Sequence, residues 1–200
     1  MAVVYSQNGA IVREVEQPAP DFIMNFRKIK GVYQSDGYNK TYSGLVYDTE
    51  NNIYEAKFTI TSIPDGQNFY VFRETRDNIN LYVSKVPYEN AVYIDGVRVS
   101  LKLNTPYVVR RNKSVLTIDG TDYSSGYNSG VYNEIYIGPT HNSTPYTYSG
   151  AYLEYITVLD RSTGKVLFDK RAASRDKDNQ VGLLDVAAGG FFTTYLDGVR

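Results

Sequence analysis

The sequence predicts an all-β protein that folds as a two-sheet antiparallel sandwich. The first observation is composition: the 200 residues include 20 Tyr and 8 Phe, and aromatic residues suit the pleated, half-buried surface of a sheet. The second is the alternation of apolar and polar residues at period two between turn signals, which is typical of strands. The third is that no window combines helical apolar spacing with capping residues.

One domain preceded by an N-terminal arm is the predicted organisation. A hydrophobic content of 42% suffices for one sizeable core, since a domain takes about 150 residues. Pro18 and Pro20 can extend neither a helix nor a central strand. We therefore place a boundary there, with residues 1–20 as the arm and residues 21–200 as the sandwich. The alternative is that the β-prone piece at residues 10–15 forms the first strand of the same sheet.

The clearest strand in the first half of the chain is expected around residues 54–60. A period of two places its apolar residues on one face and its polar residues on the other: Tyr54, Ala56, Phe58 and Ile60 against Glu55, Lys57 and Thr59. Residues 79–84 repeat the pattern, with Ile79, Leu81 and Val83 on the apolar face.

Tight turns separate the strands that follow. Asp95-Gly96 and Asp119-Gly120 are predicted turns, because glycine tolerates the positive φ that such turns require. Asn112-Lys113 is expected to form a two-residue hairpin loop between strands at 107–111 and 114–118.

The longest strand is expected at residues 152–159, closed by a turn at 161–164 before a further strand at 165–168. In all we expect about a dozen short strands. That number fits a two-sheet sandwich or jelly roll better than an open sheet.

The order of elements between Ser149 and Phe192 resembles the ending of the LamG-like, concanavalin-A-like jelly-roll domains. The resemblance is carried by the strand and turn at 152–164, the strand at 165–168, and the runs Val181-Gly-Leu-Leu-Asp185 and Gly190-Phe-Phe192. Upstream, Arg111–Asp122 and Asn133–Gly138 are similar to the family's central hairpin and the strand after it. The chain departs from the family pattern at Ala172-Ala173, where a proline is usual, and at Leu184, where an aromatic is usual. The resemblance implies a jelly roll over about 22–192.

Charge and cysteine usage narrow the possible partners. The chain has 21 basic and 22 acidic residues without a Lys/Arg run, so nucleic acid is not an expected partner. The absence of cysteine excludes disulfides, thiolate nucleophiles and thiolate metal sites. No segment approaches the roughly 18 apolar residues of a membrane span. The N-terminus also lacks the pattern of a signal peptide, so we expect synthesis in a cytoplasm and no membrane partner. LamG-like domains are frequent in bacteriophage structural proteins, so the resemblance implies a final location in a virion.

Catalytic chemistry is not expected. The single histidine, His141, lies in a Ser/Thr/Pro loop without an acidic neighbour, which disfavours a nucleophilic triad. Glycoside hydrolysis requires two carboxylates about 5 to 10 Å apart. Glu14 and Glu16 have the alternate spacing that places two acids on one strand face, but both lie in the predicted arm.

A calcium ion is conceivable at Asp176 and Asp178, which are spaced as Asp-x-Asp in a loop. This loop lacks the glycine and the distal glutamate of a complete calcium loop, and basic neighbours dilute its negative field. A solvated, charged turn is the favoured alternative, and no other cofactor is expected.

Tyrosines in loops rich in Ser, Asn and Gly are the candidate ligand- or partner-binding residues, because a rigid aromatic offers contact area at low entropic cost. They are Tyr123, Tyr127, Tyr132, Tyr146 and Tyr148. Three alternatives stay open: the rings cap the ends of the sandwich, contact a partner protein, or stack on a glycan.

Taken with the resemblance, these observations predict a non-enzymatic structural or adhesion module of a bacteriophage particle: a head fibre, a capsid decoration or a tail-associated subunit. We expect residues 1–20 to contact other virion proteins, and the chain to form a homo-oligomer. The alternative is a carbohydrate-binding lectin that contacts a host-surface glycan through its Tyr-rich loops. A polysaccharide-degrading enzyme would need a carboxylate pair across a cleft.

Overall fold

A computed structural model describes residues 26–28, 32–34, 41–42, 47–66, 68–74, 80–126, 131–132, 135–137, 150–187 and 191–194. Within these residues all regular structure is β, in 18 antiparallel strands and no helix, which confirms the all-β prediction. The number exceeds the expected dozen because several strands have only two or three residues. The predicted arm, residues 1–20, lies outside the described residues, as do His141, Glu14 and Glu16.

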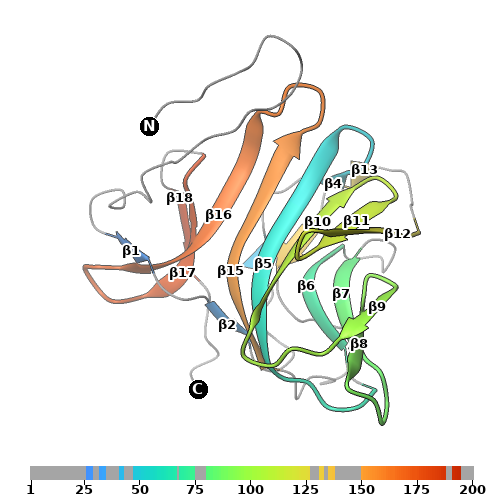
Figure 1. The fold of residues 1–200 in the computed structure, drawn as a ribbon. Helices are drawn as coiled ribbons and strands as arrows, with labels where there is room; N and C mark the ends of the chain where they lie inside the picture. Colours follow the sequence, from blue (N-terminus) through green and yellow to red (C-terminus); the bar gives the residue numbers. More distant parts are fainter. Residues whose placement is uncertain are drawn as a thin grey trace.

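A ten-stranded sheet forms the larger layer, and its long central strands β5, β15 and β16 run side by side (Figure 1). Eight strands follow one another across it: β12 (Thr121–Ser124), β11 (Val115–Ile118), β10 (Pro106–Asn112), β5 (Asn52–Ser62), β15 (Gly150–Asp160), β16 (Val166–Arg175), β17 (Val181–Asp185) and β18 (Phe191–Thr194).

Two short strands complete this sheet where β15 and β16 separate. The two long strands pair with each other between Tyr155 and Leu159 only. Beyond this stretch β2 (Val32–Gln34) pairs with β15, and β1 (Phe26–Lys28) pairs with β16. Among the described residues, the first strand of the main sheet, β1, therefore begins a few residues after the predicted boundary.

The smaller layer has six strands in the order β3 (Thr41–Tyr42), β14 (Ile135–Ile137), β6 (Asn68–Glu74), β7 (Asn80–Lys85), β8 (Ala91–Ile94) and β9 (Val97–Ser100). A separate two-stranded pair joins β4 (Tyr47–Asp48) to β13 (Val131–Tyr132). No helix in the described part of the chain is long and apolar enough to cross a membrane.

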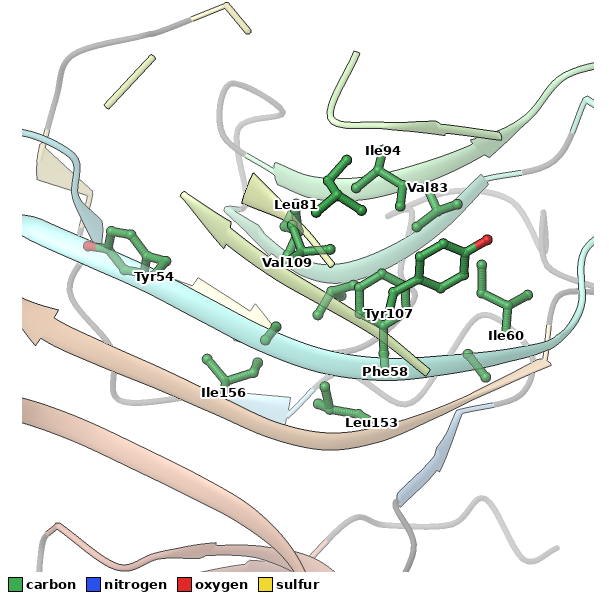
Figure 2. Close-up of a cluster of buried hydrophobic side chains, with 14 of the residues drawn as sticks. Tyr54, Phe58, Ile60, Leu81, Val83, Ile94, Tyr107, Val109, Leu153 and Ile156 are labelled. Carbon is green, nitrogen blue, oxygen red and sulfur yellow. The ribbon is translucent and has the colours of Figure 1, made fainter. Parts of the chain in front are cut away.

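One hydrophobic core lies between the two sheets. Figure 2 shows Phe58, Tyr107 and Ile156 of the larger sheet facing Val83 and Ile94 of the smaller one. The rings of Phe58 and Tyr107 stack with centroids 5.6 Å apart. Because Phe58 is fully buried, its replacement by alanine is expected to cost about 3–5 kcal/mol.

The predicted face assignment of β5 is confirmed by burial. Its apolar residues from Tyr54 to Ile60 are buried in the core, while Glu55 and Lys57 are half-buried on the opposite face. Thr59 differs, because it is buried although it lies on the polar face. Leu81 and Val83 of β7 are also buried, as predicted.

The tight turns agree with the sequence at two positions and differ at a third. Asp95 and Asp119 have φ of 47° and 50°, and the glycine after each has φ of 83°, as a primed hairpin turn requires. The hairpin predicted at Asn112-Lys113 is present, but its loop is Lys113-Ser114, one residue later. Asn112 stays in the ladder opposite Val115, and its side-chain oxygen accepts a hydrogen bond from Arg161 Nε at 2.8 Å.

Candidate functional site

Among the five predicted tyrosines, only Tyr123 has a described side chain. It lies on β12 opposite Leu116, is half-buried, and packs against the core between the sheets. This placement corresponds to the alternative in which the ring caps the sandwich. Tyr132 lies in β13, where its backbone pairs with Tyr47. The side chain of Tyr132, and all of Tyr127, Tyr146 and Tyr148, lie outside the described residues.

Asp176 and Asp178 lie in the turn between β16 and β17. The carboxylate of Asp178 accepts hydrogen bonds from Arg175 Nε at 3.0 Å and from Arg175 Nη2 at 2.6 Å. This contact holds the pKa of Asp178 below its usual value. Asp178 therefore stabilises its own turn. Among the described residues, no three His, Asp or Glu side chains are grouped so that they could hold a metal ion.

The outer face of the ten-stranded sheet, opposite to the core, carries an array of polar side chains that we call the outer polar face. Its members come from β5, β15 and β16: Glu55, Lys57, Glu154, Tyr155, Thr157, Asp169 and Arg171. In the register, Glu55 pairs with Thr157, which pairs with Asp169. Lys57 pairs with Tyr155, which pairs with Arg171. These residues therefore lie in two adjacent rows across three strands.

The first half of this face centres on Tyr155. Its Oη donates a hydrogen bond to Glu55 Oε1 at 2.8 Å. Burial, reinforced by the negative charge of Glu55, raises the pKa of Tyr155 well above its usual value. Lys57 Nζ lies 2.9 Å from Glu154 Oε2, and Glu154 sits at an irregularity in the pairing of β15 with β5.

The second half centres on Asp169, which is only 5% exposed. Arg171 Nε donates to both of its carboxylate oxygens at 3.0 Å, and Nη2 donates to Oδ2 at 2.9 Å. Thr157 Oγ1 contacts Oδ1 at 3.1 Å. The guanidinium of Arg171 also lies over the ring of Tyr155, 5.6 Å from its centroid. Arg171 is therefore the most exposed group of this half, above a buried carboxylate.

The outer polar face carries two carboxylates, those of Glu55 and Asp169, on the two strands that flank β15. Adjacent strands are about 4.8 Å apart, so the backbones of Glu55 and Asp169 are separated by about 10 Å. Both carboxylates, however, accept hydrogen bonds from neighbouring side chains. A carboxylate that accepts three guanidinium hydrogen bonds is poorly placed to carry the proton that a general acid donates. These two carboxylates therefore suit a hydrogen-bond network that stabilises the sheet better than they suit acid catalysis.

A different aromatic residue is the most exposed large apolar side chain described. Tyr88, in the connection between β7 and β8, is 97% exposed and has φ of 61°. Its backbone N–H donates a hydrogen bond to Asp65 Oδ2 at 2.8 Å, and Asp65 lies in the connection between β5 and β6. Tyr88 was not among the predicted residues, because Pro87-Tyr88 by itself indicates only a loop.

Lys85 fixes the backbone around Tyr88. Its side chain is buried, and its Nζ donates to the carbonyl oxygens of Val86, at 2.8 Å, and of Glu89. The same ammonium lies 3.0 Å from Asp65 Oδ1. Since Asp65 also receives the N–H of Tyr88, one buried cation and one carboxylate hold both ends of the loop. We call Lys85 and Asp65 the loop clamp.

Comparison with family models, with curated proteins and with solved structures finds no match for this chain. Its function is therefore inferred from its residues and geometry.

Proposed function

We propose that the chain is a non-enzymatic structural and adhesion module of a bacteriophage particle, such as a head fibre, a capsid decoration or a tail-associated subunit. We further propose that its two sheets are those of a LamG-like, concanavalin-A-like jelly roll. The observation that carries the adhesion role is the display of Tyr88, which is 97% exposed on a loop that the clamp residues Lys85 and Asp65 hold in place.

The arrangement of the last strands supports the jelly roll. β15, β16, β17 and β18 follow one another in the chain and also lie next to one another in the sheet. They cover the segment on which the resemblance depends. In the turns from β15 to β16 and from β16 to β17, Asp160 and Asp178 each accept hydrogen bonds from residues at the turn. This end of the protein is therefore a rigid scaffold.

The outer polar face supports a role without catalysis. Glu55, Glu154 and Asp169 each accept a hydrogen bond from a side chain of the adjacent strand. These bonds cross between β5, β15 and β16 and join the three longest strands. A surface of this kind stabilises a sheet that is exposed on one side.

Adhesion by one small module requires multivalency, because linked copies bind far more tightly than one copy alone. We therefore propose that the protein forms a homo-oligomer in the particle and that residues 1–20 contact other virion proteins.

The experiment that tests this proposal is mass spectrometry of purified particles. Particles released from a host that carries this gene are expected to contain the protein at a fixed copy number. Antibody labelling in electron micrographs is expected to place it on the head or the tail. Particles that lack the protein, when it is abundant in the same lysate, would overturn the proposal.

A second measurement tests the arm. The full chain is expected to elute as an oligomer in light scattering. Deletion of residues 1–20 is expected to reduce incorporation into particles while the β-sheet circular dichroism spectrum is kept. Equal incorporation of the deleted form would remove the arm from the proposal.

A further inference from the structure

Lys170 places an amine on the core face of the larger sheet. Side chains alternate along β16, so Phe168, Lys170 and Ala172 share one face, while Asp169 and Arg171 lie on the outer polar face. Phe168 and Ala172 belong to the core between the two sheets. Lys170 itself is only 3% exposed. An ammonium in such surroundings is costly unless a partner compensates its charge.

Asp185 of β17 is the residue directly opposite Lys170. The register pairs Lys170 with Asp185 on one side and with Ile156 of β15 on the other. Leu183, two residues before Asp185, is a core residue, so Asp185 also lies on the core face. It is 7% exposed. An amine and a carboxyl group therefore extend from opposite positions of two paired strands into the same buried region.

The distance between these positions is within the reach of a lysine side chain. Figure 1 shows β16 and β17 side by side. Directly opposite residues of an antiparallel pair have Cβ atoms about 4.5–5.5 Å apart. The flexible four-carbon stem of lysine therefore allows the amine of Lys170 to meet the carboxyl carbon of Asp185.

The surroundings of Lys170 favour a neutral amine. Burial lowers the pKa of Lys170, and the negative charge of Asp185 opposes this effect only in part. Nζ lies 5.1 Å from the centroid of the Phe168 ring, and Ile156 at the opposite position is fully buried. Surroundings of low polarity disfavour an ammonium and a carboxylate alike. Transfer of one proton from nitrogen to oxygen then leaves an amine and a carboxylic acid, which are the two forms that condense to an amide.

The ion pair of the loop clamp shows by contrast why this pair is suited to that reaction. The side chain of Lys85 is buried, but the side chain of Asp65 is 45% exposed, so its carboxylate keeps contact with water. Ion pairs that contain arginine differ as well, because a guanidinium stays protonated and is not a nucleophile. Lys170 and Asp185 combine a lysine, a carboxyl group and burial on both sides.

A cross-link at this place has a structural use. The chain has no cysteine and therefore forms no disulfide. A bond between residues 170 and 185 restricts the unfolded chain in the same way as a disulfide does. It also ties β17, and with it the paired strand β18, to the long central strands.

We propose that Lys170 and Asp185 form an intramolecular isopeptide bond. The lone pair of Lys170 Nζ attacks Cγ of the protonated Asp185 carboxyl group, and a C–N bond forms. One C–O bond breaks, and the departing hydroxyl takes a proton from the nitrogen and leaves as water. The product is an amide between β16 and β17. This inference does not depend on whether the chain belongs to a phage particle.

Intact-mass spectrometry of the full chain is the test. After prolonged incubation at neutral pH, the folded protein is expected to be lighter than its sequence by one water molecule. Tryptic digestion is expected to give a branched peptide that joins the segment containing Lys170 to the segment containing Asp185. Lys170→Arg and Asp185→Ala should each have the full mass of their sequence, because neither variant has both reacting groups.

The matched control is Lys57→Arg, on the outer polar face, where Lys57 and its partner Glu154 are 28% and 23% exposed. This variant should still lose one water molecule. A wild-type chain that keeps its full mass after incubation would overturn the inference. So would a water loss that persists in Lys170→Arg, since it would indicate a cyclic imide at a sequence such as Asp95-Gly96. The mass and the branched peptide of the wild type decide the question even if a variant fails to fold.

Discussion

Arg111 on β10 forms an ion pair with Asp95 in the turn between β8 and β9, and so connects the two sheets at one end. Both side chains are largely buried. The remaining donors of Arg111 reach the carbonyl oxygens of Lys113 at 3.1 Å and Gly126 at 3.0 Å, and Ser125 Oγ at 2.7 Å. One guanidinium therefore connects both sheets and the segment after β12.

Replacing Arg111 by methionine is expected to destabilise the fold by about 3 kcal/mol, because it leaves the Asp95 carboxylate largely buried without its cation. The control is Lys113→Met, which breaks the exposed pair with Glu50 and should cost less than about 1 kcal/mol. Urea unfolding of both variants measures the difference. Equal losses would show that the cross-sheet pair contributes no more than a surface pair.

Stability is expected to fall above pH 10. Burial raises the pKa of Tyr54 from 10.0 to about 12, and it raises that of Tyr155 further. The folded protein holds these phenol protons more tightly than the unfolded chain. The resulting stabilisation is therefore complete below pH 10 and is lost as the pH rises through the folded pKa.

Each of these two phenols lowers the free energy of unfolding by at most about 1.4 kcal/mol per pH unit. Tyr155→Phe and Tyr54→Phe should each make the loss of folding stability with rising pH less steep, as measured by urea unfolding between pH 9 and 11. Tyr88→Phe, at an exposed ring, is the control and should leave the slope as it is. A wild-type protein with constant stability over this range would contradict the prediction.

Structural features set by residues close together in the sequence could be predicted, whereas features set by residues far apart in the sequence could not. The faces of β5 and the turns at Asp95 and Asp119 follow from local alternation and from glycine at positive φ, and both were predicted. The one-residue error at Lys113 arose because Asn112 is held in the ladder by its pair with Val115 and by Arg161, far along the chain.

The site depended on contacts that local patterns do not contain. The row from Glu55 through Thr157 to Asp169 requires the register of three strands. Tyr123 looked like a loop tyrosine, but β12 pairs with β11 and turns its ring toward the core. The display of Tyr88 depends on Lys85, at the end of β7, and on Asp65, in the connection between β5 and β6. The dipeptide Pro87-Tyr88, which indicates only a loop, is the one signal that the sequence offers here.

Replacing Lys85 by methionine is expected to loosen the connection between β7 and β8 without unfolding the sheets. The change removes the ammonium that contacts Val86 O, Glu89 O and Asp65. Hydrogen exchange is expected to rise at the amides of Tyr88 and Glu89, whose bonds lie inside the clamp, while the amides of β5 stay protected. Lys57→Met, on the other sheet, is the control. Unchanged exchange in the loop would show that the clamp does not order it.

Tyr88→Gly is expected to keep the stability of the fold or to raise it slightly. Glycine adopts positive φ without the penalty of roughly 1–2 kcal/mol that a side chain incurs. It also increases the freedom of the unfolded chain, which offsets about 0.4–1 kcal/mol of that gain. Since the ring of Tyr88 is 97% exposed, no packing is lost. Urea unfolding should therefore find the variant as stable as the wild type or slightly more stable. A clear loss of stability would show that the ring has a folding role.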